Sequence, residues 1–171
     1  MIRGRLLVTI GASLVLAAAA QADDKARDKD SEKEPLAVVE LGGAAERGLP
    51  GDSSFGPSAA VEFTVVREWL EVEAGVAPML SHGSTDWETG FVLKKPFKLS
   101  DKVEFMIGAG PQWTFTREGT KVGGTLAADF MIWPTADRRF GWFVQPAYGY
   151  SFSSGHEQTL GVTAGLLIAI Q

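Results

Sequence analysis

Apolar residues recur at every second position from residue 36 onward, and turn-forming residues separate the runs. A period of two is typical of β-strands, and none of these runs keeps the 3.6-residue period of a helix. The pattern predicts eight strands, over residues 36–44, 58–67, 69–80, 86–97, 102–116, 121–133, 140–152 and 157–170. It therefore indicates an all-β domain built from antiparallel hairpins.

The two faces of the predicted strands differ in size and charge. In the run over 58–67, for example, Val61 and Phe63 flank Glu62. Across the runs one face is bulky, apolar and nearly uncharged, whereas the other carries glycine, alanine, threonine and acids. A soluble barrel has the opposite arrangement, with an apolar interior and a charged exterior. We therefore expect the apolar face to contact lipid and the small, polar face to fill the interior of a narrow barrel.

Strands that face lipid must leave no sheet edge open, because each unpaired backbone group in hydrocarbon costs several kcal/mol. The predicted fold is thus a closed, eight-stranded, antiparallel up-and-down transmembrane β-barrel. If its N-terminus is periplasmic, the odd-numbered connections lie outside, and the first of them, over 45–57, is the longest. Because proline removes a ladder hydrogen bond, Pro78, Pro111 and Pro146 are expected at bulges or with the missing donor pointing outward.

Large aromatic residues gather near the ends of the predicted strands, where the girdles of a membrane barrel meet the lipid headgroups. Aromatic residues also favour strands in general, so the set indicates a girdle more strongly than any one member does. The predicted girdle consists of Trp69, Trp87, Trp113, Trp142, Tyr148 and Tyr150.

The first 22 residues have the three parts of a secretory signal peptide. Arg3 and Arg5 provide the basic start, residues 6–20 form an apolar run, and Ala20-Gln21-Ala22 offers small residues for cleavage after Ala22. The run is too short to span a bilayer as a helix. The predicted organisation is a signal peptide over 1–22, a charged flexible segment over 23–35 and the barrel over 36–171.

Composition narrows the class of function. The segment 23–35 carries six acids and four bases, which is typical of a solvated spacer. Cleavage would remove two arginines and no acid, changing the formal net charge from −5 to −7. So acidic a chain lacks the basic footprint of a nucleic-acid-binding protein. The sequence contains no cysteine, which excludes disulfides, thiolate metal sites and a lipoprotein anchor.

The signal peptide, the eight alternating runs and the inverted polarity together make the chain resemble the small OmpA/OmpX-type barrels of the bacterial outer membrane. The resemblance covers residues 36–171 and is one of pattern rather than of a diagnostic motif. It implies an outer-membrane location, with lipid, lipopolysaccharide and the barrel-assembly machinery as partners. Members usually end in an aromatic residue, whereas here Ile170 takes that place.

The candidate site is a set of charged residues on the inward face. The predicted interior charge network consists of Glu62, Glu71, Glu73, Glu88, Lys94, Glu104 and Asp129. A short turn at 67–68 places Glu62 opposite Glu73, and a symmetric loop over 81–86 places Glu73 opposite Lys94, with Glu104 diagonal to it. Buried like charges repel unless a cation or a shared proton intervenes, so Lys94 is expected among the acids.

Two interpretations of this network remain open: a gate or proton-sensitive plug, and a structural ion network in a barrel too narrow to be a channel. The structural interpretation is favoured, because eight strands leave an interior that side chains fill. The expected function is accordingly a structural or surface-interaction role in the outer membrane, with a narrow pore for ions or small solutes as the alternative.

A lipid-modifying enzyme is the other alternative, because a nucleophile needs a base and an orienting acid within hydrogen-bond reach. His82 and Ser84 have the spacing seen in lipid A deacylases, but Glu88 is expected to point inward. His156 has Ser153, Ser154 and Glu157 near it in sequence. Loop histidines are usually only solvated, so no catalytic residue is predicted. The spacing of histidines and carboxylates predicts no metal site, and no cofactor is expected.

Overall fold

The alternating runs form eight strands in a computed structural model of the chain. It describes residues 35–49, 51–81, 83–135, 137–153 and 155–170. The predicted signal peptide and almost all of the charged segment lie outside the described residues. The strands are β1 (Ala37–Gly48), β2 (Ser53–Val66), β3 (Leu70–Ser81), β4 (Ser84–Lys98), β5 (Val103–Phe115), β6 (Thr120–Ile132), β7 (Phe140–Ser151) and β8 (Gln158–Ile170).

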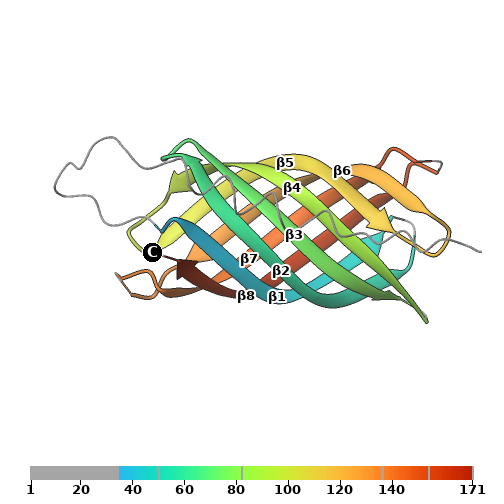
Figure 1. The fold of residues 1–171 in the computed structure, drawn as a ribbon, viewed down its shortest axis with the longest axis horizontal. Helices are drawn as coiled ribbons and strands as arrows, with labels where there is room; N and C mark the ends of the chain where they lie inside the picture. The colour runs from blue at the N-terminus through green and yellow to red at the C-terminus, as the bar shows by residue number, and fades with distance from the viewer. Residues whose placement is uncertain (1–34, 50, 82, 136, 154, 171) are drawn as a thin grey trace, which may run out of the picture. The chain divides into compact units, whose positions relative to one another are not determined.

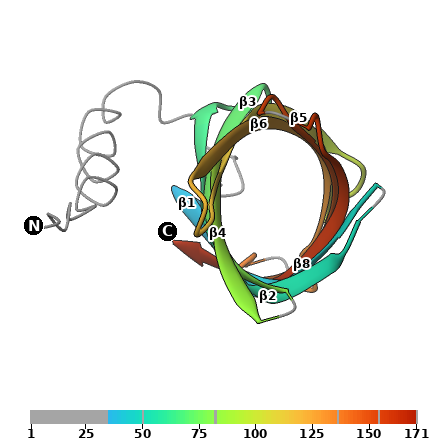
Figure 2. The ribbon, with the colours of Figure 1, turned by 90° about the vertical axis from the view of Figure 1, so that its right-hand side faces the viewer.

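Each strand pairs antiparallel with its neighbour in sequence, and β1 pairs with β8 to close the barrel. The closing seam is continuous, from Ala37↔Ile170 at one end to Gly48↔Thr159 at the other. Figures 1 and 2 show the result as a ring of tilted strands around one axis. The predicted fold class is confirmed. None of the described residues belongs to a helix long and apolar enough to cross a membrane.

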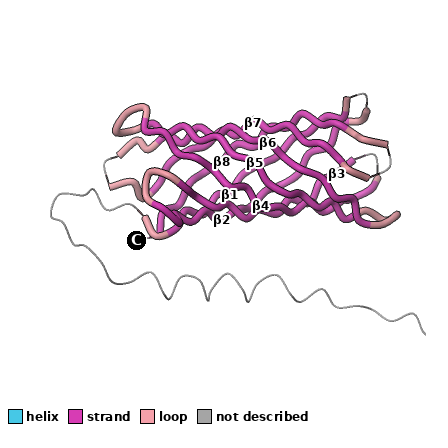
Figure 3. The backbone as a smooth tube through the Cα atoms, turned by 90° about the horizontal axis from the view of Figure 1, so that it is seen from above, coloured by secondary structure: helices cyan, strands magenta, loops and turns pink. Residues whose placement is uncertain are grey.

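The connections are short at both ends of the barrel (Figure 3). β1 and β2 are joined by residues 49–52 alone, so the prediction of a long first connection over 45–57 is wrong. The reason is that Ala44, Ala45 and Glu46 continue the alternation of β1, and β2 pairs with them from Ser53 onward. At 12 to 15 residues the strands are longer than a bilayer needs.

The outward alternation is apolar and exposed, as predicted. Leu93 is 55% exposed, Leu126 is 52% exposed and Leu166 is 47% exposed, and similar side chains surround the barrel. Exposing so large an apolar surface to water would be costly, whereas exposing it to the hydrocarbon of a membrane is not.

Each of the three prolines considered in the sequence analysis lies where the pairing on one side of its strand lapses without a change of register. Pro111 falls between Gly90↔Gln112 and Leu93↔Ala109, and Pro146 falls between Ala127↔Ala147 and Phe130↔Val144. Pro78 has the same position on the β2 side of β3, between Phe55↔Leu80 and Ala59↔Val76. The register shift between these two strands is at Thr64 and Val66, away from Pro78. A missing donor is thus accommodated by a local gap in the ladder rather than by a bulge.

Candidate functional site

The centre of the barrel is a charged layer built around one buried lysine. The side chain of Lys94, from β4, is only 1% exposed. Its Nζ donates to Glu62 Oε2 of β2 at 2.8 Å and to Asp129 Oδ2 of β6 at 2.7 Å, and it also contacts Glu73 of β3. Lys94 therefore ties together strands from both sides of the barrel.

Glu40 and Gln145 complete this layer, which we call the lysine layer: Glu40, Glu62, Glu73, Lys94, Asp129 and Gln145. Gln145 Nε2, on β7, donates to Glu73 Oε2 at 2.8 Å. Glu40 Oε1, on β1, lies 3.9 Å from Lys94 Nζ, which is beyond hydrogen-bond distance, and it has no hydrogen-bond partner among the described residues. All six side chains are nearly inaccessible to solvent.

The four carboxylates of the lysine layer offer oxygens within 4.8 Å of one another, an arrangement that could hold a metal ion. The Lys94 ammonium lies among these oxygens and contacts three of the carboxylates. A single ammonium faces four acids, so the layer has a formal charge of −3 when every group is ionised. The layer thus remains attractive to a further positive charge.

We call the end of the barrel where Ala37 pairs with Ile170 the inner end, and the opposite end the outer end. On the inner side of the lysine layer the interior is packed with large apolar side chains. We call this cluster the inner plug; it consists of Val38, Met106, Met131, Trp133, Phe143 and Leu167. Leu167 is 0% exposed and Trp133 is 1% exposed. Trp133 Nε1 donates to Glu104 Oε2 at 3.1 Å, and Arg138 forms an ion pair with the same oxygen at 3.1 Å. The inner half of the barrel is therefore filled.

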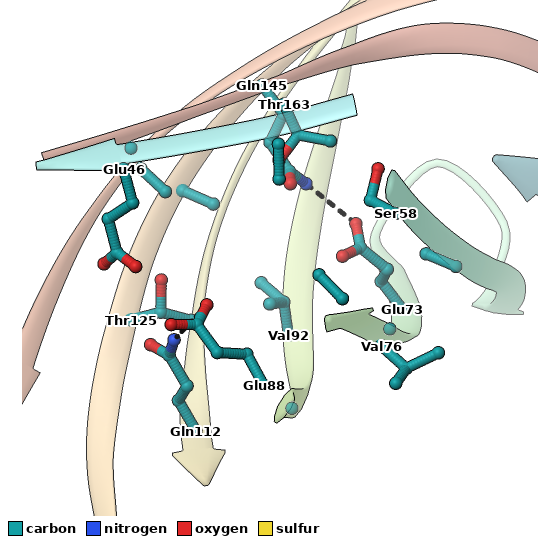
Figure 4. Close-up of a pocket in the computed structure, with 18 of the residues that line it drawn as sticks. Glu46, Ser58, Glu73, Val76, Glu88, Val92, Gln112, Thr125, Gln145 and Thr163 are labelled. Carbon is teal, nitrogen blue, oxygen red and sulfur yellow. Dashed lines mark hydrogen bonds between the residues drawn. The ribbon is translucent and has the colours of Figure 1, made fainter. Parts of the chain in front are cut away.

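Above the lysine layer the interior is hollow. A cavity of about 150 Å³ extends from Glu40, Glu73 and Gln145 to Glu46 and Glu88 (Figure 4). It adjoins a second cavity of about 490 Å³ at the outer mouth, and the two share Glu46, Glu88, Gln112 and Gly149 in their linings. The walls are open because the inward residues here are mostly glycine, alanine, serine and threonine.

The predicted network residues all line the interior, but they fall into three groups. Glu62, Glu73, Lys94 and Asp129 meet in the lysine layer. Glu71 and Glu104 line a small cavity of about 30 Å³ near the inner end. Glu88 lies in the outer half, where it accepts a hydrogen bond from Gln112 at 3.3 Å.

The register of β3 and β4 corrects the predicted pairing. Glu62 does lie opposite Glu73. The placement of Lys94 opposite Glu73 is wrong, because Lys94 pairs with Glu71 and Glu73 pairs with Val92. The hairpin closes at Ser81↔Ser84, which shortens the expected loop and shifts every pair by two residues.

Glu104 does not belong to the lysine layer either, so its predicted position diagonal to Lys94 is wrong. It pairs with Lys98, near the inner end of the barrel, and its cationic partner is Arg138. The sequence reasoning also missed Glu40, although Glu40 is the single acid in the run over 36–44 and is flanked by Val39 and Leu41. It missed Gln145 and the inward side chain of Trp133 as well.

The outer rim holds His156, one of the two histidines that the sequence analysis considered for catalysis. The Tyr150 hydroxyl and His156 Nδ1 are 3.1 Å apart, and the two rings stack. Lys121 Nζ forms an ion pair with Glu157 at 2.6 Å beside them. His82 and Ser154 lie outside the described residues. Glu88 lines the interior of the barrel, as expected.

Of the six predicted girdle residues, Trp69, Trp87 and Trp142 are more than half exposed, whereas Trp113, Tyr148 and Tyr150 are partly buried and Tyr150 lines the mouth cavity. Trp69 and Trp142 lie toward the inner end of the barrel and are 60% and 57% exposed. Trp87 and Trp113 lie toward the outer end of β4 and β5, and Tyr148 and Tyr150 toward the outer end of β7. The six residues therefore lie toward the two ends of the strands, and their role as a girdle stays a prediction.

Comparison of structures, but not of sequences, finds known proteins that resemble this barrel. No protein-family model matches the chain, and no curated protein sequence does. Neisserial surface protein A superposes with a TM-score of 0.62 at 12% identity, covering 78% of this chain and 96% of that one. Ail, the attachment invasion locus protein of Yersinia pestis, superposes with a TM-score of 0.51 at 12% identity, covering 80% and 99%. A de novo designed transmembrane β-barrel gives 0.52 at 14% identity, covering 82% and 100%.

These identities are too low to carry more than the fold. The chain has the fold of the small eight-stranded outer-membrane barrels, as its closed topology and apolar outer surface require.

Proposed function

We propose that this protein is a sealed barrel of the bacterial outer membrane, exported by cleavage after Ala22, with a structural and surface-interaction role rather than that of a pore. The observation that carries the proposal is the filled inner half. Side chains that line a water-filled pore are exposed to its water, but Lys94, Met106 and Phe143 are at most 2% exposed. Two successive barriers, one charged and one apolar, thus close the cross-section.

The short connections at the outer end favour interaction with partners at the barrel mouth rather than through long loops. The outer connections span only residues 49–52, 82–83, 116–119 and 152–157. Described residues of these short connections line the mouth cavity of about 490 Å³. Neisserial surface protein A and Ail are a surface protein and an attachment invasion locus protein. We infer for this chain a surface exposure of the same kind, with lipopolysaccharide around the rim and the barrel-assembly machinery as the partner in insertion.

Planar-bilayer recordings test the sealed state. The refolded wild-type barrel is expected to give no steady current, and Lys94→Met is expected to stay silent because the inner plug still closes the barrel. The Lys102→Met variant, at an exposed turn lysine, is the charge-matched control. A steady wild-type current would contradict the proposal and favour a pore. A current that appears only in Lys94→Met would instead make the lysine layer the gate.

A further inference from the structure

The outward surface of the barrel carries one lysine where the neighbouring outward positions are apolar. Lys95 lies on β4 between Leu93 and Phe97, and in the ladder with β5 it lies opposite Ile107. Among the outward positions of the eight described strands, the other charged residue is Arg47, one position from the outer end of β1. Charged side chains are rare on a lipid-facing surface, and they usually mark a functional site.

The Lys95 side chain is held in place by three groups that carry no net charge. Its Nζ donates to the Glu68 carbonyl oxygen at 2.7 Å, and it lies 5.9 Å from the centre of the Trp69 ring and 5.8 Å from that of Phe97. Both rings are within range of a cation–π interaction. An ammonium has three donors, and the Glu68 carbonyl accepts from one of them. The ammonium is thus positioned without being neutralised.

The acids of the two nearest inner connections to the chain's cations leave Lys95 out. Asp101 Oδ1 lies 3.4 Å from Lys98 Nζ, and Asp137 Oδ2 lies 3.7 Å from Arg139 Nε. No ion pair among the residues that the structure describes includes Lys95. Its positive charge therefore attracts an anion that the protein itself does not provide.

Lys95 lies at the height where lipid headgroups meet hydrocarbon. The 15 residues of β4 span about 50 Å along the strand and roughly 38 Å along the axis of a barrel with strands tilted by about 40°. A bilayer is about 40–45 Å thick with its headgroups and about 30 Å without them, so each headgroup layer is about 5–8 Å deep. Lys95 is three residues from the end of β4 at Lys98, which is roughly 8 Å along the axis. Its ammonium is thus level with the phosphate groups of the lipids around the inner end.

The surface beside Lys95 suits an acyl chain. From Lys95 toward the middle of the barrel, the outward positions of β4 are Leu93 and Phe91, which are 55% and 47% exposed. Trp69, at the other side of the ammonium, is 60% exposed. A cation thus lies at one end of an apolar track, which is the order of charge and hydrocarbon in a phospholipid.

We propose that Lys95, Trp69 and Phe97 bind the headgroup of an anionic phospholipid in the leaflet at the inner end. The Lys95 ammonium donates to the phosphate oxygens, the two rings border the headgroup, and an acyl chain packs along Leu93. A phospholipid with a net negative charge is preferred over a zwitterionic one, whose own ammonium offsets its phosphate. This inference rests on the proposed function, because the inner end lies in a phospholipid leaflet only in the outer-membrane orientation proposed above.

Other anions fit this surface less well. An acidic protein segment at this height would bring unpaired backbone groups next to hydrocarbon. A free phosphate ion has no apolar part to contact Leu93 or Ile107. The combination of charge and apolar surface therefore favours the intact lipid.

Native mass spectrometry of the refolded barrel in detergent tests the proposal. With equimolar phosphatidylglycerol and phosphatidylethanolamine of identical acyl chains, we expect the adduct with one phosphatidylglycerol to be about fivefold more abundant, the factor that one lysine contributes to binding an anionic lipid surface. Lys95→Gln should lower this ratio to about one, and Lys95→Arg should keep it, because the charge is kept. The control is Lys102→Gln, which removes the same charge from an exposed turn at the same end and should leave the ratio unchanged.

Three results would overturn the inference: equal adducts of the two lipids on the wild-type barrel, equal loss of preference in Lys95→Gln and Lys102→Gln, or displacement of the lipid by excess glycerol phosphate. Circular dichroism of each variant confirms that the barrel has folded. Bilayer recordings on the same samples separate this failure from failure of the proposed function. A silent barrel without the preference removes only the lipid site, whereas a conducting barrel that keeps the preference removes only the sealed state.

Discussion

The outer and inner halves of the barrel interior are built from the same alternation but are packed in opposite ways. In the outer half most of the inward positions hold glycine, alanine, serine or threonine, and a cavity of about 150 Å³ remains. In the inner half they hold Met106, Phe143 and Leu167, and the cross-section is filled. The lysine layer lies at the boundary. The comparison shows that residue volume on one face, rather than strand number alone, decides how much of a narrow barrel is open.

The largest effect on stability is expected from a substitution in the lysine layer, which forms the boundary between the two halves. Lys94→Met leaves four buried carboxylates without their ammonium, and removing one partner of a buried charge pair costs about 3–5 kcal/mol of the free energy of unfolding. Urea unfolding in detergent micelles, followed by tryptophan fluorescence, measures this loss. Lys102→Met should lose less than about 0.5 kcal/mol, as surface substitutions do. Equal stability of the two variants would refute a structural role for the lysine layer.

Replacing one glycine by alanine in each half adds a methyl group there and tests directly whether the two halves differ in packing. A Cβ on Gly141 in the inner half would lie 2.7 Å from the Ile132 carbonyl oxygen and 2.9 Å and 3.1 Å from side-chain atoms of Trp133 and Leu167. Overpacking of this kind costs about 1–3 kcal/mol. On Gly161 in the outer half the nearest atom is 3.5 Å away, which is ordinary contact.

Gly141→Ala should therefore lower the free energy of unfolding, whereas Gly161→Ala should leave it within about 0.5 kcal/mol of wild type. The same urea titration measures both variants. If the two alanines cost the same, the halves do not differ in packing in the way that the cavity implies.

The smallest effect is expected at the rim. The Lys121–Glu157 ion pair is short, at 2.6 Å, but its side chains are 39% and 56% exposed. Exposed pairs contribute about 0.2–1 kcal/mol, so Lys121→Ala should shift the unfolding midpoint far less than Lys94→Met. Thermal unfolding at low and high salt measures the difference, and a loss as large as that of Lys94→Met would show that burial is not what gives the lysine layer its strength.

Much of the fold could be predicted because the alternation along each strand shows which side chains face the lipid and which face the interior. Leu126, Ala127, Ala128 and Asp129 alternate along β6 in the sequence as they do between the lipid and the interior. Strand ends were less certain where small residues continue the alternation. Ala44 and Ala45 carry too little hydrophobic signal to separate a strand from a loop, and the first connection was therefore predicted too long.

The candidate site was only half predictable. The inward direction of Lys94, Glu62 and Asp129 follows from the period of two, and so does that of Glu40, Met106 and Leu167, which the sequence reasoning passed over. The sequence of a single strand does not show at which height along the barrel axis its side chains meet those of other strands. Lys94 pairs with Glu71 in the ladder, yet its ammonium binds Glu62 and Asp129.

The sequence by itself therefore determined the strands, their two faces and the lipid-facing surface, because these depend on local alternation and on the cost of unpaired backbone groups in a membrane. The tertiary structure alone decided that one lysine unites acids from four strands and that the interior is hollow above it and packed below. The physical reason is the tilt and stagger of the closed barrel, which bring residues far apart in the chain to a common level.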